Sequence, residues 1–183
     1  WSSHVALVFG VGCPYGERMV PLESQNAAMG FYFYPRGGSA QVARYLSRAL
    51  VGTGWEPTVF SGSLGSHSEP SHAGRFFDKV RLASLDYSPA MQAWKAGLDP
   101  MSATVPMHAS YEDKPDVPDR AFARLDDAAY QRQVRSWRRF LEERAVVVPT
   151  VVHLHHLTPM HEAVYQLWPH VPVRSEERRV GKE

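Results

Sequence analysis

The stretch FYFYPRGGSAQVARYLSRAL, residues 31–50, constrains the fold more than any other part of the chain. Its first four residues form an aromatic run typical of a buried strand, and two adjacent glycines, Gly37 and Gly38, follow shortly after it. Ser39 is a good helix N-cap, and the apolar residues behind it recur at helical spacing: Val42, Leu46, Ala49 and Leu50. The stretch therefore predicts a strand over residues 31–34, a tight turn and a helix.

The alternation of strands and helices continues along the chain. Residues 57–62 and 75–82 predict two further strands, whereas residues 87–119, rich in proline, predict a long loop or a short irregular insertion. An amphipathic helix around Tyr130 follows, capped by Asp126 or Asp127. A β-branched run ending in histidines leads to a helix begun by Thr158 and Pro159, and residues 171–173 predict a buried strand. This order predicts an α/β fold with a Rossmann-like parallel sheet and flanking helices.

The glycine pair lies where such folds bind ligands, beyond the carboxyl end of a strand. Glycine lets a ligand approach the backbone closely, and the helix that follows points free N–H groups and its positive dipole end outward, which favours a phosphate. A plain tight turn is the alternative. Gly10 and Gly12, after a strand-like run at residues 4–9, compete for the same role. Neither G-x-G-x-x-G nor G-x-x-x-x-G-K-[ST] occurs, so dinucleotide-binding dehydrogenases and P-loop NTPases lose support.

The histidines at the end of the strand around residue 153 form a second candidate site. Strand alternation places His153 and His155 on one face and His156 on the other, so the three converge only if the strand ends at His155. A zinc site needs three or four convergent ligands, yet Cys13 is remote in the sequence and no H-E-x-x-H occurs. We therefore expect no metal. Three histidines in irregular stretches are expected at the surface: His67, His72 and His108.

Composition limits the class of protein. The 20 lysines and arginines nearly balance the 19 aspartates and glutamates, which argues against a nucleic-acid partner. The chain has one cysteine, which agrees with a reducing compartment, and no apolar run approaches the roughly 20 residues needed to cross a bilayer. We expect a single soluble, cytoplasmic domain without a transmembrane segment, and peripheral membrane contact stays open.

Two segments resemble one known family. YPRGGSAQVARYLSRALVGTGWEPTVFSG, residues 34–62, resembles the first strand, glycine loop and helix of retaining glycosyltransferases of the GT-B type, in the group called family 4 or group 1. VVHLHHLTPMHEAVYQLWPHVPV, residues 151–173, is similar to that family's fourth strand and the helix behind it. The two segments follow in the order and spacing of the family, whereas residues 66–118 match it poorly. The resemblance implies the N-terminal half of a GT-B fold.

The resemblance also implies a function. The intact enzyme would transfer a hexose from a nucleotide diphosphate sugar to an acceptor that the sequence does not identify, with no cofactor. Gly37, Gly38 and Ser39 would bind the donor phosphates or the acceptor, together with Arg36. His155 and His156 would line the sugar-binding cleft, with no metal ligands and no catalytic residues in this chain. The alternative is a non-catalytic Rossmann-like module that binds a sugar or a nucleotide.

The resemblance further implies a domain organisation. Residues 29–173 would form the acceptor-side domain, and residues 1–28 an N-terminal extension or an extra strand. Residues 174–183 are highly charged and keep no strand or helix period, so we expect a non-native tail. Nothing in the sequence matches the basic pair and spaced glutamates of the family's donor-binding domain. We therefore expect this chain to be a fragment that is inactive alone.

Overall fold

The computed structural model describes residues 24–33, 35 and 37–176. In this part of the chain five parallel strands form one sheet in the order β3-β2-β1-β4-β5. The strands are β1 (Gln25–Phe31), β2 (Trp55–Ser63), β3 (Arg81–Asp86), β4 (Val151–His155) and β5 (Val173–Glu176). This order reverses between β1 and β4, which is the position where Rossmann-like sheets bind their ligands.

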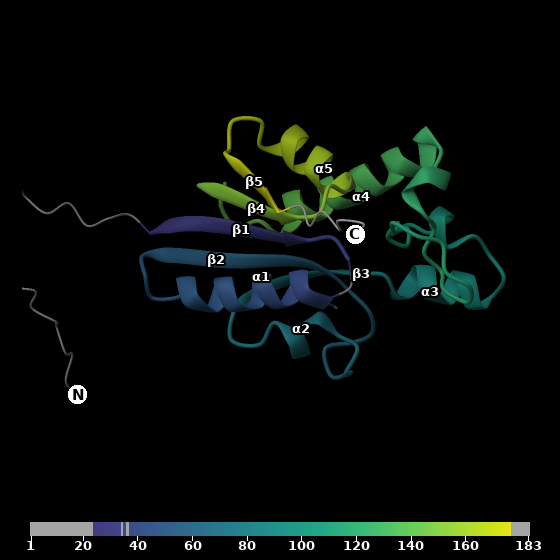
Figure 1. The fold of residues 1–183 in the computed structure, drawn as a ribbon, viewed down its shortest axis with the longest axis horizontal. Helices are drawn as coiled ribbons and strands as arrows, with labels where there is room; N and C mark the ends of the chain where they lie inside the picture. Colours follow the sequence, from purple (N-terminus) through teal and green to yellow (C-terminus); the bar gives the residue numbers. More distant parts are fainter. Residues whose placement is uncertain (1–23, 34, 36, 177–183) are drawn as a thin grey trace, which may run out of the picture.

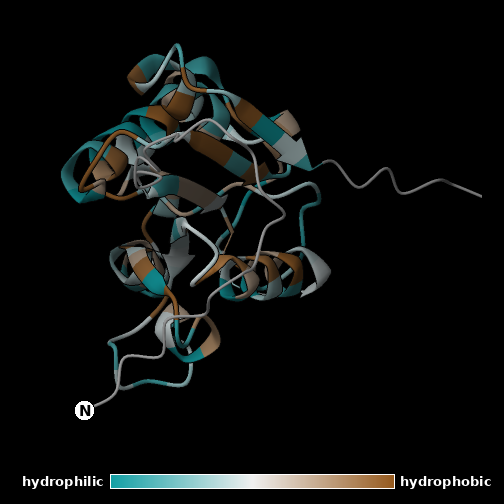
Figure 2. Cartoon of the chain, turned by 90° about the vertical axis from the view of Figure 1, so that its left-hand side faces the viewer, coloured by the Kyte–Doolittle hydropathy of each residue, from teal (hydrophilic) through white to brown (hydrophobic). Residues whose placement is uncertain are grey.

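Helices cover both faces of the sheet (Figure 1). α1 (Gly37–Leu50) and the short α2 (Ala73–Phe76) pack on one face, around Met29 and Phe31. The opposite face carries α3 (Ser88–Lys95), α4 (Asp127–Arg144) and α5 (Pro159–Leu167), with 3-10 turns η1 (Pro100–Ser102) and η2 (Phe122–Arg124) between them. Figure 2 shows apolar strands between the two helical layers. The predicted α/β, Rossmann-like fold is confirmed.

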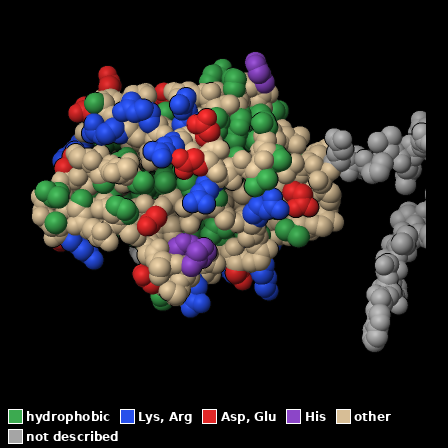
Figure 3. Space-filling model, turned by 180° about the vertical axis from the view of Figure 1, so that it is seen from behind, with side chains coloured by type: hydrophobic (Ala, Val, Ile, Leu, Met, Phe, Trp, Pro, Cys, Tyr) green, Lys and Arg blue, Asp and Glu red, His purple; other side chains and the backbone are tan. Residues whose placement is uncertain are grey.

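α4 forms as its sequence pattern predicts. Asp126 caps it, because its Oδ1 atom accepts a hydrogen bond from the backbone N–H of Ala129 at 2.6 Å. The apolar stripe faces the sheet, and Trp137 is fully buried. The outer face is charged, with Arg135 and Arg138 exposed, and basic side chains gather at the upper left of Figure 3. The helix therefore owes its position to its apolar stripe rather than to ion pairs.

β1 lies earlier in the chain than expected. The strand ends at Phe31, so the prediction of a strand over residues 31–34 is wrong in its position. The real strand, QNAAMGF, is rich in small residues because its neighbours pack closely on it. A Cβ atom added at Gly30 would lie 2.2 Å from Leu154 Cδ2 and 2.8 Å from Met160 Cε. The aromatic residues that suggested a strand, Tyr32 and Phe33, instead begin the loop beyond it.

α1 also presents a different face from the one that its spacing predicts. Ala40, Ala43 and Ser47 are buried, whereas Val42 and Leu46 expose 50% and 37% of their surface. Ala40 and Ala43 pack against Met29 and Phe31 of β1 and Val59 of β2. The expected apolar stripe through Val42 and Leu46 is therefore wrong.

Other elements differ in their bounds. The third strand begins at Arg81, and the preceding phenylalanines belong to α2 and its end. The region expected to be one long loop contains α3 and η1. β1 begins at Gln25, before the expected domain start at residue 29, and β5 pairs residues 174–176 of the expected tail with β4. Residues 1–23 and 177–183, with Gly10, Gly12 and Cys13, lie outside the described residues.

Candidate functional site

The site predicted from the sequence lies at the reversal of strand order, between β1 and β4. These strands are hydrogen-bonded neighbours, and Phe31 at the end of β1 pairs with His155 at the end of β4. Beyond β1 the chain turns into α1 on one face of the sheet, and beyond β4 it turns into α5 on the other (Figure 1). The two segments that suggested a ligand site therefore meet at one edge.

Ser39 and His156 form the direct contact between these segments. Ser39 Oγ lies 2.9 Å from His156 Nε2, although the two residues are 117 positions apart. Ser39 belongs to the first turn of α1. His156 follows the last residue of β4 and has a φ of 65°, a backbone conformation that is uncommon outside glycine and that ends the strand. This turn points the imidazole toward α1 instead of continuing the sheet.

The glycine turn lies beside this contact. Gly37 has a φ of 80°, which side chains disfavour, and a Cβ atom built there would have no neighbour within 4 Å among the described residues. Gly38 is exposed at the start of α1, and Arg36 lies outside the described residues. The first turn of a helix leaves backbone N–H groups without helical partners and carries the positive end of the dipole. The open space above Gly37 thus faces a helix end suited to an anion.

His155 does not join His156 at this edge. Its side chain is buried on the α1 side of the sheet, with ring centroids 6.3 Å from Phe31 and 4.8 Å from His153. Within the described part of the chain, its Nε2 atom has no hydrogen-bond partner. Burial, and then the nearby His153 and His156, lower the pKa of His155 to about 4, so the imidazole is neutral near neutral pH.

The pH dependence of stability provides a test of this burial. Below about pH 6.5, the unfolded chain protonates His155 whereas the folded chain does not until about pH 4, so the contribution of His155 lowers the free energy of unfolding across that window and is constant below it. In His155→Leu, we expect a shallower fall when urea unfolding is measured across the window. His170→Leu, which changes an exposed histidine, should keep the wild-type slope. Parallel curves for the wild type and His155→Leu would contradict the buried, neutral state.

An aromatic cluster stands around His156. It consists of Phe33, His108, Tyr111, Phe122 and His156, with neighbouring ring centroids between 5.3 and 6.5 Å apart. Tyr111 exposes 57% of its surface. Aromatic faces of this kind pack against the C–H face of a sugar ring or against a base. The sequence patterns missed this cluster, because Tyr111 and Phe122 lie in a region without periodicity.

A hollow of about 320 Å³ adjoins the cluster at the start of α5. Its lining includes Phe122, Tyr130, Leu157, His161 and Glu162. The backbone N–H of Thr158 donates to His161 Nδ1 at 3.3 Å, so Nε2 carries the ring proton of the neutral imidazole and donates to Ser175 at 2.9 Å. Glu162 accepts a hydrogen bond from Gln131 Nε2 at 3.0 Å. The hollow thus combines an apolar wall with oriented polar groups.

Two of the histidines expected at the surface have structural roles. His72 is buried and accepts a hydrogen bond from Gly74 N at 2.9 Å, capping α2. His108 is half-buried, and its ring lies 5.3 Å from that of Phe33. Only His67 is exposed as predicted. The surface prediction is therefore wrong for His72 and His108.

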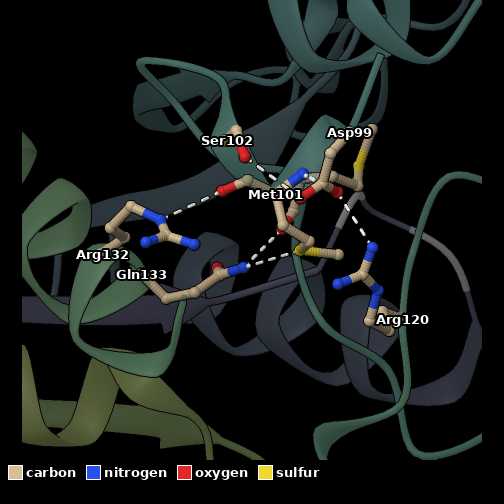
Figure 4. A network of polar contacts seen from close by, with 7 residues as sticks. Asp99, Met101, Ser102, Arg120, Arg132 and Gln133 are labelled. Atoms are coloured by element: carbon tan, nitrogen blue, oxygen red, sulfur yellow. Dashed lines mark hydrogen bonds and ion pairs between the residues drawn. The ribbon is translucent and has the colours of Figure 1, made fainter. Parts of the chain in front are cut away.

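A polar network fixes the loop that carries His108 and Tyr111 of the aromatic cluster (Figure 4). Asp99 accepts from Arg120 at 2.9 Å and from the backbone N–H of Met101 at 3.1 Å. On the α4 side, Arg132 Nε donates to the Met101 carbonyl at 3.3 Å, and Gln133 reaches the same turn. Hydrogen bonds at η1 thus hold the loop before Phe122 against α4.

Comparisons with family models, curated proteins and solved structures find no match to this chain. Among the described residues, no set of three or more histidine, cysteine, aspartate or glutamate side chains is arranged to hold a metal ion. No helix in the same part of the chain is both long and apolar enough to cross a membrane. The roles of Gly37, Gly38, Ser39, Arg36 and His156 thus stay predictions that rest on geometry and resemblance.

Proposed function

We propose that this chain is the acceptor-side half of a retaining GT-B glycosyltransferase that resembles family 4 and transfers a hexose from a nucleotide diphosphate sugar. The observation that carries the proposal is the 2.9 Å contact between Ser39 Oγ and His156 Nε2. It joins the two sequence segments on which the resemblance rests, at the reversal of strand order where Rossmann-like sheets bind ligands.

The proposed roles follow from the chemistry of the groups. The N–H groups at the start of α1, beside Gly37 and Gly38, would hold the donor diphosphate and stabilise its charge as it leaves. The Ser39 hydroxyl and the His156 imidazole would bind phosphate or sugar oxygens. The aromatic cluster would provide a face for the sugar ring. Basic groups of a donor-binding half would complete the neutralisation, as the resemblance implies.

Titration with uridine diphosphate glucose tests the proposal. Ser39→Ala should weaken binding of the probe about 5–10-fold, which corresponds to the loss of one hydrogen bond. Thr53→Ala serves as the matched control, because it removes a hydroxyl near the other end of α1 that donates to the Leu50 carbonyl. Isothermal titration calorimetry gives the affinities. If Ser39→Ala and Thr53→Ala bind equally well, the phosphate role of the glycine turn is wrong.

The alternative, a non-catalytic binding module, predicts the same binding but a different outcome for activity. The resemblance implies that the donor-binding half completes the reaction site, so the purified chain should bind the probe without releasing uridine diphosphate. Adding the matching donor-binding half should restore transfer. If tight binding of the probe persists and no such half restores transfer, the module becomes the better description. Turnover by the purified chain alone would contradict the fragment hypothesis.

A further inference from the structure

A second and larger hollow lies at the same edge of the sheet, beyond the ends of β2 and β3. Its volume is about 490 Å³, and it lies between the loop after β2 and the helix α3. Its lining combines polar side chains, among them Glu69, Asp86 and Ser88, with the apolar surface of Leu64 and Met91. None of these residues belongs to the proposed phosphate site at Ser39 and His156, so the hollow needs its own explanation.

Glu69 is an exposed carboxylate at this hollow that accepts hydrogen bonds from two serines. The Ser66 hydroxyl donates to Glu69 Oε1 at 3.1 Å, and the Ser71 hydroxyl donates to Oε2 at 3.4 Å. The backbone N–H of Ser66, then these hydroxyls, lower the pKa of Glu69. The carboxylate retains unused lone pairs, since each of its oxygens can accept more than one hydrogen bond.

Asp86 and Ser88 add an acceptor and a donor from the other wall. The backbone N–H of Ser88 donates to Asp86 Oδ1 at 2.9 Å, which fixes the carboxylate at the end of β3. Ser88 Oγ accepts from the backbone N–H of Gly65 at 2.8 Å, so its own hydrogen points elsewhere and can serve a ligand. Two carboxylates from different elements thus face one hollow.

The charge and the apolar surface of the lining indicate which class of ligand the hollow can bind. Among the described lining residues, two carboxylates outnumber the single cation, Lys95, and this net negative charge disfavours phosphates and other anions. The described residues provide no metal-binding set of three ligands here. Leu64 and Met91 are half-buried and supply an apolar surface. A neutral or amine-bearing ring with adjacent hydroxyls satisfies all of these groups, because paired hydroxyls donate to a carboxylate and the C–H face packs on apolar side chains.

We propose that this hollow, the Glu69–Asp86 pocket, binds a monosaccharide unit with adjacent hydroxyls, neutral or carrying an amino group. The pocket engages the sugar through Glu69 and Asp86 as acceptors and Ser88 as donor. The proposal does not depend on the glycosyltransferase assignment, since it involves none of the residues at the glycine turn.

Nuclear magnetic resonance titration of the full chain with glucose and glucosamine tests this pocket. We expect saturable shifts at amides of the pocket such as Gly65 and Met91, and at least fivefold weaker binding measured at these amides in Glu69→Gln and in Asp86→Asn. Glu112→Gln, an exposed carboxylate outside the pocket, should bind like the wild type. Absence of saturable shifts with both sugars up to about 50 mM would overturn the proposal. Unchanged sugar binding in Glu69→Gln and Asp86→Asn would also overturn it, provided that circular dichroism shows both variants to be folded.

Measuring sugar binding and pyrophosphate binding in both variants tests this pocket independently of the proposed function. Ser39→Ala should leave the sugar-induced shifts of the pocket amides Gly65 and Met91 unchanged, whereas Glu69→Gln should leave the affinity for inorganic pyrophosphate unchanged. A loss of monosaccharide binding in Ser39→Ala would overturn the independent pocket and place the sugar at the glycine turn. Failure of pyrophosphate to bind the wild type would count against the proposed function alone, because the pocket makes no use of phosphate.

Discussion

Trp137→Ala is expected to lower the free energy of unfolding by about 3–5 kcal/mol, the usual cost of truncating a buried tryptophan. Trp137 is fully buried between α4 and the sheet, with ring centroids 5.7 Å from Tyr32 and 5.6 Å from Phe140. Its removal leaves a cavity that the rigid strand β1 cannot fill. Guanidinium unfolding followed by circular dichroism measures the loss.

Arg138→Ala is the matched control for this substitution. Arg138 is the next residue of α4 and is exposed, so its replacement should change the free energy of unfolding by less than about 0.5 kcal/mol. A loss below about 1.5 kcal/mol for Trp137→Ala would mean that α4 does not pack on the sheet as described.

The parts of the fold that the sequence predicted are those with long periods and clear caps. α4 keeps an apolar stripe over several turns behind Asp126, and α5 begins with Thr158 and Pro159, so local chemistry and packing agree. The position of β1 and the buried face of α1 were predicted wrongly, because packing at both elements selects for small residues. At Gly30 the space left by Leu154 and Met160 is too small for a side chain. A pattern of hydrophobic residues does not show how much space is available at a position.

The candidate site was predictable only in part, for a similar reason. Parallel topology brings the end of β1 beside the end of β4, so the proximity of Ser39 to the strand-end histidines could be expected. The positive φ of His156 directs this histidine, rather than His155, toward Ser39. A histidine in the sequence does not by itself predict a positive φ. Tyr111 and Phe122 reach the site through contacts far apart in the sequence, which periodicity cannot reveal.

The second large effect is expected at Gln133, which ties the site's loop to the core. Its Oε1 atom accepts from the Tyr32 hydroxyl, and its Nε2 atom donates to the Met107 carbonyl, all in the buried interior. Gln133→Leu removes the amide, so the Tyr32 hydroxyl and the Met107 carbonyl both lose their hydrogen-bond partner. We expect the free energy of unfolding to fall by about 2–4 kcal/mol, because two buried polar groups lose a hydrogen bond without gaining water. Urea unfolding measures this change.

A double-mutant cycle tests that explanation against simple misfit of leucine. Tyr32→Phe removes the hydroxyl that Gln133→Leu leaves without its acceptor, so the double variant should lose less than the sum of the single losses. Additive losses would show that steric misfit, not the hydrogen bond, causes the damage. The backbone N–H of Ala109 also donates to the Tyr32 hydroxyl at 3.3 Å, so Tyr32→Phe alone loosens the chain beside His108. If the cycle shows coupling, hydrogen exchange should be faster at Ala109 in both single variants, which would link the buried glutamine to the order of the aromatic cluster.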